Sequence, residues 1–231
     1  MNALPHILVA DDVRRRLQWP DWVRPHVLMG SLAPDAYRIV PGLDYRALHF
    51  RYRHGVGQRL SDYLADHLRP ALREGGHDEQ AFRVGWLSHI LSDLVWQKML
   101  REQFPQLWSG VLGQKAETGR RLRLEYQNAC DRIDREIAQS QSEYLAEVRW
   151  TLRSANPQYD LTPLNVTVLN EWIGRVAIES LPPSAPPTPG IDYLQAEFVH
   201  RACATGAERT VALMTREYES DTAPVSDFLD Q

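Results

Sequence analysis

One stretch of the chain, residues 78–103, limits the possible folds more than any other. It has the length and pattern of a single helix, and its middle, residues 82–96, is mostly apolar. A helix that is apolar on most sides is buried inside a protein. Within it, His89 and Asp93 are four residues apart, so both side chains leave the same face about one turn apart. Burying an imidazole and a carboxylate without partners is costly, and the sequence therefore predicts a partner for them in the core.

The rest of the chain also carries helical patterns. Its 231 residues are 43% hydrophobic and 24% charged, which is the balance of a globular protein with one large domain. Apolar residues recur at helical spacing, and no convincing strand pair or internal repeat is present, so we predict an all-α fold. We expect helices at residues 5–17, 57–73, 78–103, 114–153 with a kink near 119 or 140–142, about 162–181, and 191–218.

The predicted organisation follows the composition along the chain. Residues 1–181 are expected to form a helical metal-binding domain. Residues 182–190 are rich in proline and predict a stiff, extended connector. Residues 191–219 predict a long amphipathic helix that docks on the same domain, and residues 220–231 predict an acidic, frayed tail.

Charge and cysteine content exclude several classes of protein. The net charge of −4 argues against a nucleic-acid-binding surface. No apolar run is long enough to span a bilayer, and the first residues do not have the pattern of a signal peptide. Cys130 and Cys203 are isolated thiols without a CxxC spacing. We therefore expect a cytoplasmic protein with no nucleic-acid partner and no stable membrane insertion.

Two residues upstream can supply the partner that the central helix needs. Asp35 follows Pro34 at the end of an apolar run, and His49 follows a polar loop. Two imidazoles and two carboxylates form a donor set that suits zinc, with manganese or iron as other options. Taken singly, each residue also has a plain structural interpretation, such as a turn, a helix cap or a polar pair. The hypothesis of a metal site depends on all of them occurring together.

The order of these motifs resembles the zinc-dependent phospholipase C family, which is similar in fold to the single-strand-specific zinc nucleases. The resemblance implies that Asp35, His49, His89 and Asp93 surround one zinc ion. It also implies that Asp93 bridges to a second zinc ion that His6 binds, and that Asp35 orients or deprotonates the attacking water as the catalytic residue. The matching pieces lie within about residues 5–100 and are His6, Gly30-Ser-Leu-Ala-Pro-Asp35, His49 and Gly85-Trp-Leu-Ser-His89-Ile-Leu-Ser-Asp93.

The chain departs from the family pattern after Asp93. The family enzymes hold a further metal there with two histidines and a glutamate, whereas this chain has no histidine between His89 and His200. We expect that metal to be absent or to be held by carboxylates. We choose Asp134, on a predicted helix, as a further ligand beside His6 and Asp93; the alternative is that Asp134 belongs to a solvated helix face.

These observations predict a zinc-dependent phosphoesterase of phospholipase C-like type, in which one or two metal ions activate water to attack a phosphate ester. The expected partner is a small phosphate ester or a phospholipid headgroup. Arg38, Arg51 and Arg53 are candidates for a phosphate clamp. The alternative is a non-catalytic helical protein that uses the metal as a structural or ligand-binding staple. A third class, the HD-type metal phosphohydrolases, also places His and Asp ligands on helices. It needs an adjacent His-Asp pair, which we do not expect in this chain, so it ranks behind the other two.

Overall fold

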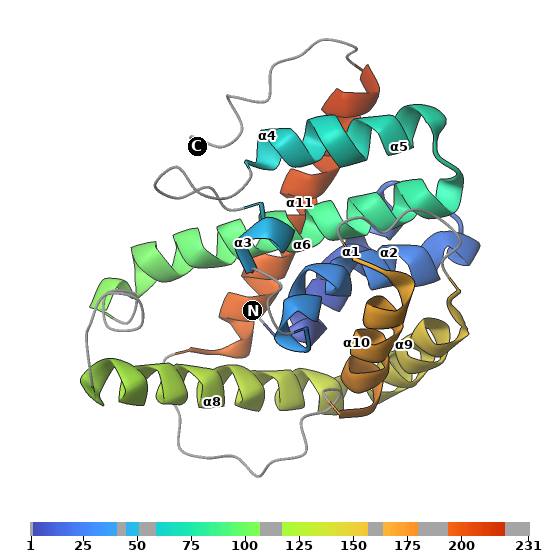
Figure 1. Cartoon of the computed structure of the whole chain (residues 1–231). Helices are drawn as coiled ribbons and strands as arrows, with labels where there is room; N and C mark the ends of the chain where they lie inside the picture. The colour runs from blue at the N-terminus through green and yellow to red at the C-terminus, as the bar shows by residue number, and fades with distance from the viewer. Residues whose placement is uncertain are drawn as a thin grey trace.

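The computed structural model describes residues 2–40, 45–50, 59–106, 117–156, 164–179 and 194–219. Within these ranges every regular element is a helix or a helical turn, so the all-α prediction is confirmed (Figure 1). The predicted connector at 182–190 and tail at 220–231 lie outside the described residues, as do Arg51 and Arg53. The elements are α1 (Ala3–Arg16), η1 (Asp21–Val23), α2 (Arg24–Leu32), η2 (Ala33–Arg38), α3 (Tyr45–Leu48), α4 (Leu60–Tyr63), η3 (Leu64–Leu68), α5 (Arg69–Glu74), α6 (His77–Gln103), α8 (Glu117–Ser140), α9 (Ser142–Ser154), α10 (Val166–Glu179) and α11 (Ala196–Glu219).

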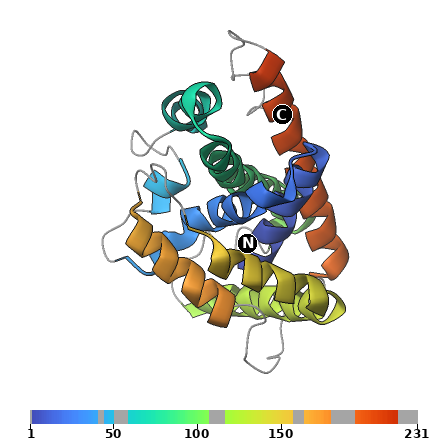
Figure 2. The same cartoon turned by 90° about the vertical axis from the view of Figure 1, so that its right-hand side faces the viewer.

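The helix α6 is the central element, as its apolar composition predicts. It packs against α1, α2 and α11, and α1 in turn packs against α2 and α11. Figure 1 shows α11 crossing α6 steeply, while Figure 2 shows α1 enclosed by its neighbours. Among the described residues, the stretch of α6 from Ala81 to Asp93 is buried without interruption. The four helices therefore share one core, and polar groups placed there face other protein groups and not solvent.

Two glycines allow α2 and α6 to pack closely in this core. A Cβ atom added at Gly30 on α2 would lie 2.0 Å from the carbonyl oxygen of Phe82, and one added at Gly85 on α6 would lie 2.1 Å from that of Val27. Both distances are far shorter than any real contact, so only glycine permits this approach. The two glycines belong to the motifs that carry Asp35 and His89, and their contact fixes those motifs relative to each other.

The last described helix, α11, lies against the central helices. A Cβ atom at Gly206 would lie 3.0 Å from the Cβ of Ser92, so α11 passes close to α6 at this point. α11 also contacts α1, where the thiol of Cys203 donates to the carbonyl oxygen of Pro5 over 3.7 Å. None of the helices in the described ranges is both long and apolar enough to cross a bilayer.

Local detail differs from the sequence-based expectations at several points. The helix expected at 57–73 begins at Leu60 and contains a π-helical turn. The segment expected to be a loop before His49 contains the short helix α3. The helix expected at 114–153 is divided at Gln141, within the predicted kink at 140–142. Just before α10, the side chain of Asn165 accepts a hydrogen bond from the backbone N–H of Val168, so Asn165 caps this helix. The predicted helix start at residue 162 lies outside the described residues.

Candidate metal centre

Five of the six predicted ligands lie together in the core. His6 comes from α1, Asp35 from η2, His49 from the residue that follows α3, and His89 and Asp93 from α6. Each of them is at most 6% exposed. Two groups of three have ligand atoms within 4.8 Å of one another: His6, His89 and Asp93 form one, and Asp35, His49 and His89 form the other. Segments far apart in the sequence therefore bring imidazoles and carboxylates to one place.

Two of the imidazoles are oriented by backbone carbonyl groups. Nδ1 of His89 lies 2.7 Å from the carbonyl oxygen of Ser31, and Nδ1 of His49 lies 3.0 Å from that of Tyr45. A carbonyl oxygen only accepts hydrogen bonds, so the proton of each ring is on Nδ1. Each Nε2 therefore carries a lone pair. Outward hydrogen bonding of this kind fixes the ring and the tautomer of metal-binding histidines.

His6 has the same orientation through a serine. Its Nδ1 lies 3.0 Å from Oγ of Ser92, and that hydroxyl donates its own proton to the carbonyl oxygen of His89 over 2.9 Å. Because the hydroxyl has only one proton, it accepts from Nδ1 of His6. The Nε2 atom of His6 consequently carries a lone pair as well. It is buried, has no hydrogen-bond partner among the residues that the structure describes, and lies 3.6 Å from Oδ1 of Asp93.

The lone pairs of two imidazoles face each other directly. Nε2 of His89 and Nε2 of His49 are 3.0 Å apart. A proton between them would relieve the repulsion, but burial lowers the pKa of His49 to about 3 and that of His89 to about 4. Near neutral pH both rings are therefore neutral, and a metal cation could accept both lone pairs. The rings of His6 and His89 stack with centroids 3.6 Å apart, which keeps their inward edges aligned.

The two carboxylates complete the donor set. Asp93 directs Oδ1 toward His6 and places Oδ2 3.8 Å from Nε2 of His49, so its two oxygens face different imidazoles. Oδ1 of Asp35 lies 3.7 Å from Nε2 of His49, and Oδ2 lies 3.2 Å from Nη2 of Arg38.

Asp134 does not join this cluster, which corrects the prediction that it lies beside His6 and Asp93. Neither group of ligand atoms includes it. It is 5% exposed, so the alternative of a solvated helix face is also wrong. Asp134 lies on the face of α8 that meets the start of α1, where Asn2 bonds to it and to the neighbouring Asp131. Burial raises the pKa of Asp134 to about 7.

After Asp93, an aromatic pair joins α6 to α8. Nε1 of Trp96, on α6, donates to the hydroxyl of Tyr126, on α8, over 2.6 Å. His200 lies exposed on α11. In the ranges that the structure describes, no third cluster of His, Cys, Asp or Glu has ligand atoms close enough to share an ion.

The chain does contain an adjacent His-Asp pair, His77-Asp78, which corrects the expectation that it has none. The pair begins α6, twelve residues before His89, and His77 is exposed. Oδ1 of Asp78 lies 3.4 Å from Nε2 of His26. Among the described residues, neither His77 nor Asp78 belongs to a group of ligands that could share an ion. The HD-type interpretation therefore gains no metal site from this pair.

Comparisons of the chain with models of known families, with curated proteins and with solved structures gave no match. Three imidazole lone pairs and two carboxylates converge in a buried space, and within the described part of the chain one of those nitrogens has no hydrogen-bond partner. Nitrogen and oxygen donors of this kind can hold a divalent transition metal.

Proposed function

We propose that this protein is a zinc-dependent phosphoesterase of phospholipase C-like type. The observation that carries the proposal is the common orientation of His6, His49 and His89, whose Nδ1 atoms bond outward and whose Nε2 lone pairs point at the two carboxylates. When bound, zinc supplies Lewis acidity that polarises phosphoryl oxygens and activates water.

The arrangement of the donors suits one or two ions. Asp35, His49, His89 and one oxygen of Asp93 would hold the first ion. His6 and the other oxygen of Asp93 would hold the second. The separate directions of the two Asp93 oxygens, toward His49 and toward His6, support this division.

Arg38 supplies the means to bind a phosphate at the edge of the cluster. Its guanidinium contacts Asp35, yet its side chain is 43% exposed and so reaches solvent. A guanidinium binds two oxygens of a phosphate at once. Asp35, which contacts Arg38, would orient or deprotonate the attacking water beside a bound phosphate. We infer that the substrate is a phosphate ester, either a small molecule or a phospholipid headgroup, whose phosphate meets Arg38.

A structural role for the metal is the second candidate. The observation in its favour is burial, because all five donor residues are almost inaccessible to solvent. A closed shell of protein ligands is typical of structural zinc, whereas a catalytic ion keeps a position for water. The catalytic role is favoured because buried Asp35 contacts Arg38, whose exposed side chain connects the cluster to solvent.

The test combines zinc binding and hydrolysis in the same preparations. The protein is loaded with zinc, its metal content is measured, and the release of p-nitrophenol from bis-p-nitrophenyl phosphate is followed. His89→Ala and Asp35→Asn should lose zinc and hydrolysis while retaining helical circular dichroism. His200→Ala, which changes an exposed histidine, is the matched control and should retain both. Zinc binding without hydrolysis would establish the staple, and absence of zinc binding would overturn both candidates.

A further inference from the structure

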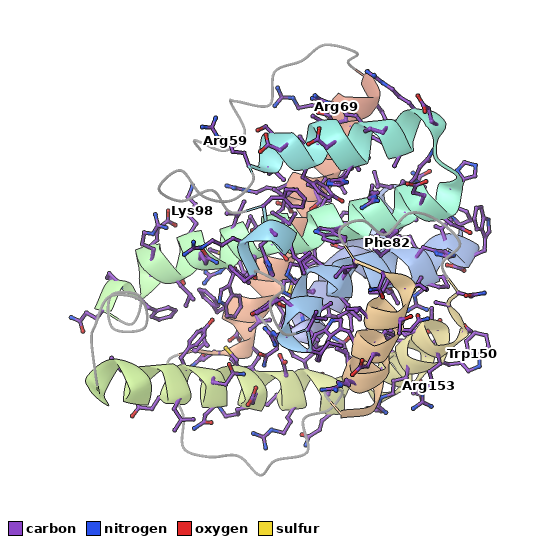
Figure 3. All side chains as sticks on the ribbon, in the orientation of Figure 1. Arg59, Arg69, Phe82, Lys98, Trp150 and Arg153 are labelled. Carbon is purple, nitrogen blue, oxygen red and sulfur yellow. The ribbon has the colours of Figure 1, made fainter. Side chains whose placement is uncertain are left out.

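A cavity of about 280 Å³ lies between α6 and α11, apart from the metal centre. Val95 and Met99 give it an apolar part, and its charged groups are Lys98, Arg201, Arg209 and Glu102. Figure 1 shows α6 and α11 crossing, and the cavity lies beside this crossing. Figure 3 shows Lys98 on the upper side of α6. The volume is suited to a small molecule and not to a folded partner.

Two arginines supply the positive charge on which a ligand of this cavity would depend. Lys98 and Glu102 also line it, and Lys98 has an interaction of its own. Arg201 donates to the amide oxygen of Gln103 over 2.9 Å, which orients the guanidinium without neutralising it. Arg209 is half-buried, and no hydrogen bond or ion pair joins its side chain to the residues that the structure describes. A partly desolvated cation without a counter-charge favours an anion beside it.

We propose that this cavity is a binding site for a small anion that carries a phosphate group. Arg201 and Arg209 are the residues that would recognise it, because planar guanidinium groups match the geometry of phosphate oxygens. Val95 and Met99 would contact an apolar portion of the same ligand. The site uses none of the five metal-centre residues, so it does not depend on the proposed phosphoesterase activity.

The test is calorimetric titration of inorganic phosphate into the chelator-treated protein at constant ionic strength in chloride. We expect saturable binding that weakens at least about tenfold, or roughly 1.4 kcal/mol, in the double variant Arg201→Gln/Arg209→Gln. Arg153→Gln removes an exposed arginine of α9 that points away from the molecule (Figure 3) and should leave the affinity unchanged.

Two results would overturn the proposal. One is the absence of saturable binding to the metal-free wild-type protein, and the other is equal affinity in the wild type and the double variant. Phosphate binding that requires zinc and disappears in His89→Ala would place the anion at the metal centre, and would also contradict a site between α6 and α11. Because the main titration uses metal-free protein, failure of this proposal is distinguishable from failure of the proposed activity.

Discussion

The substitution Gly85→Ala tests how the fold positions the metal centre. Its Cβ would lie 2.1 Å from the carbonyl oxygen of Val27 and 3.0 Å from the backbone nitrogen of Ser31. Both contacts are with backbone, so no side chain can rotate away. The helices α2 and α6 would have to separate by more than an ångström. That movement would also break the hydrogen bond between His89 and Ser31, which is 2.7 Å long.

The expected loss of stability can be worked from these contacts. Overpacking of a core typically costs about 1–3 kcal/mol, and a rigid backbone contact belongs at the upper end of that range. The broken hydrogen bond adds about 1 kcal/mol. Alanine is favoured over glycine within a helix by about 1 kcal/mol, which offsets part of the loss. We therefore expect Gly85→Ala to lower the free energy of unfolding by about 3 kcal/mol, and Tm by about 10 °C for a chain of this length.

The assay is urea denaturation followed by circular dichroism, with zinc affinity measured on the folded variant. Gly174→Ala is the control, because this glycine also lies inside a helix but has nothing within 4 Å of an added Cβ. We expect the control to gain about 0.5–1 kcal/mol and to retain zinc affinity. If Gly85→Ala unfolds at the same urea concentration as the control and binds zinc equally well, the close crossing does not position His89.

Three further substitutions test single contacts. Ser92→Ala removes the acceptor that orients His6 and should weaken zinc binding by about 10- to 100-fold, measured by competition with a chelating dye; unchanged affinity would contradict the assigned tautomer. Arg38→Gln should lower phosphodiester turnover while leaving the zinc content intact, and a loss of zinc would instead make Arg38 a support for Asp35. Burial raises the pKa of Asp134 to about 7, so the folded protein keeps this carboxyl protonated where the unfolded chain ionises it, and stability falls as the pH rises from about 4 to about 7. Asp134→Asn should remove this dependence of the free energy of unfolding on pH. In urea at about pH 8 it should be more stable than the wild type by on the order of 2–4 kcal/mol. An equal dependence on pH in both proteins would refute the raised pKa of Asp134.

The sequence predicted the parts of the site that depend on local spacing. His89 and Asp93 share a helix face because they are four residues apart, and the apolar composition of α6 places that face in the core. The motif order also indicated that Asp35, His49 and His6 belong with them, and the geometry brings these residues together.

The sequence did not predict features that depend on how helices meet. Ser31 and Tyr45 orient imidazoles through their backbone carbonyls, and every residue has such a carbonyl. Ser92 was visible between His89 and Asp93, one turn after His89, but its bond to His6 depends on how α1 packs against α6. Asp134 was misplaced for the same reason, since spacing on a helix gives the face but not the neighbour that the face meets.

X-ray absorption at the zinc edge tests the central claim most directly. For protein loaded with zinc and freed of excess metal, we expect a first shell of nitrogen and oxygen atoms at about 2.0–2.1 Å, with the outer-shell scattering that imidazoles produce. His89→Ala should lose that signal. A first shell with sulfur at about 2.3 Å, which only cysteine ligands such as Cys130 or Cys203 would give, or a protein that retains no zinc, would contradict the account.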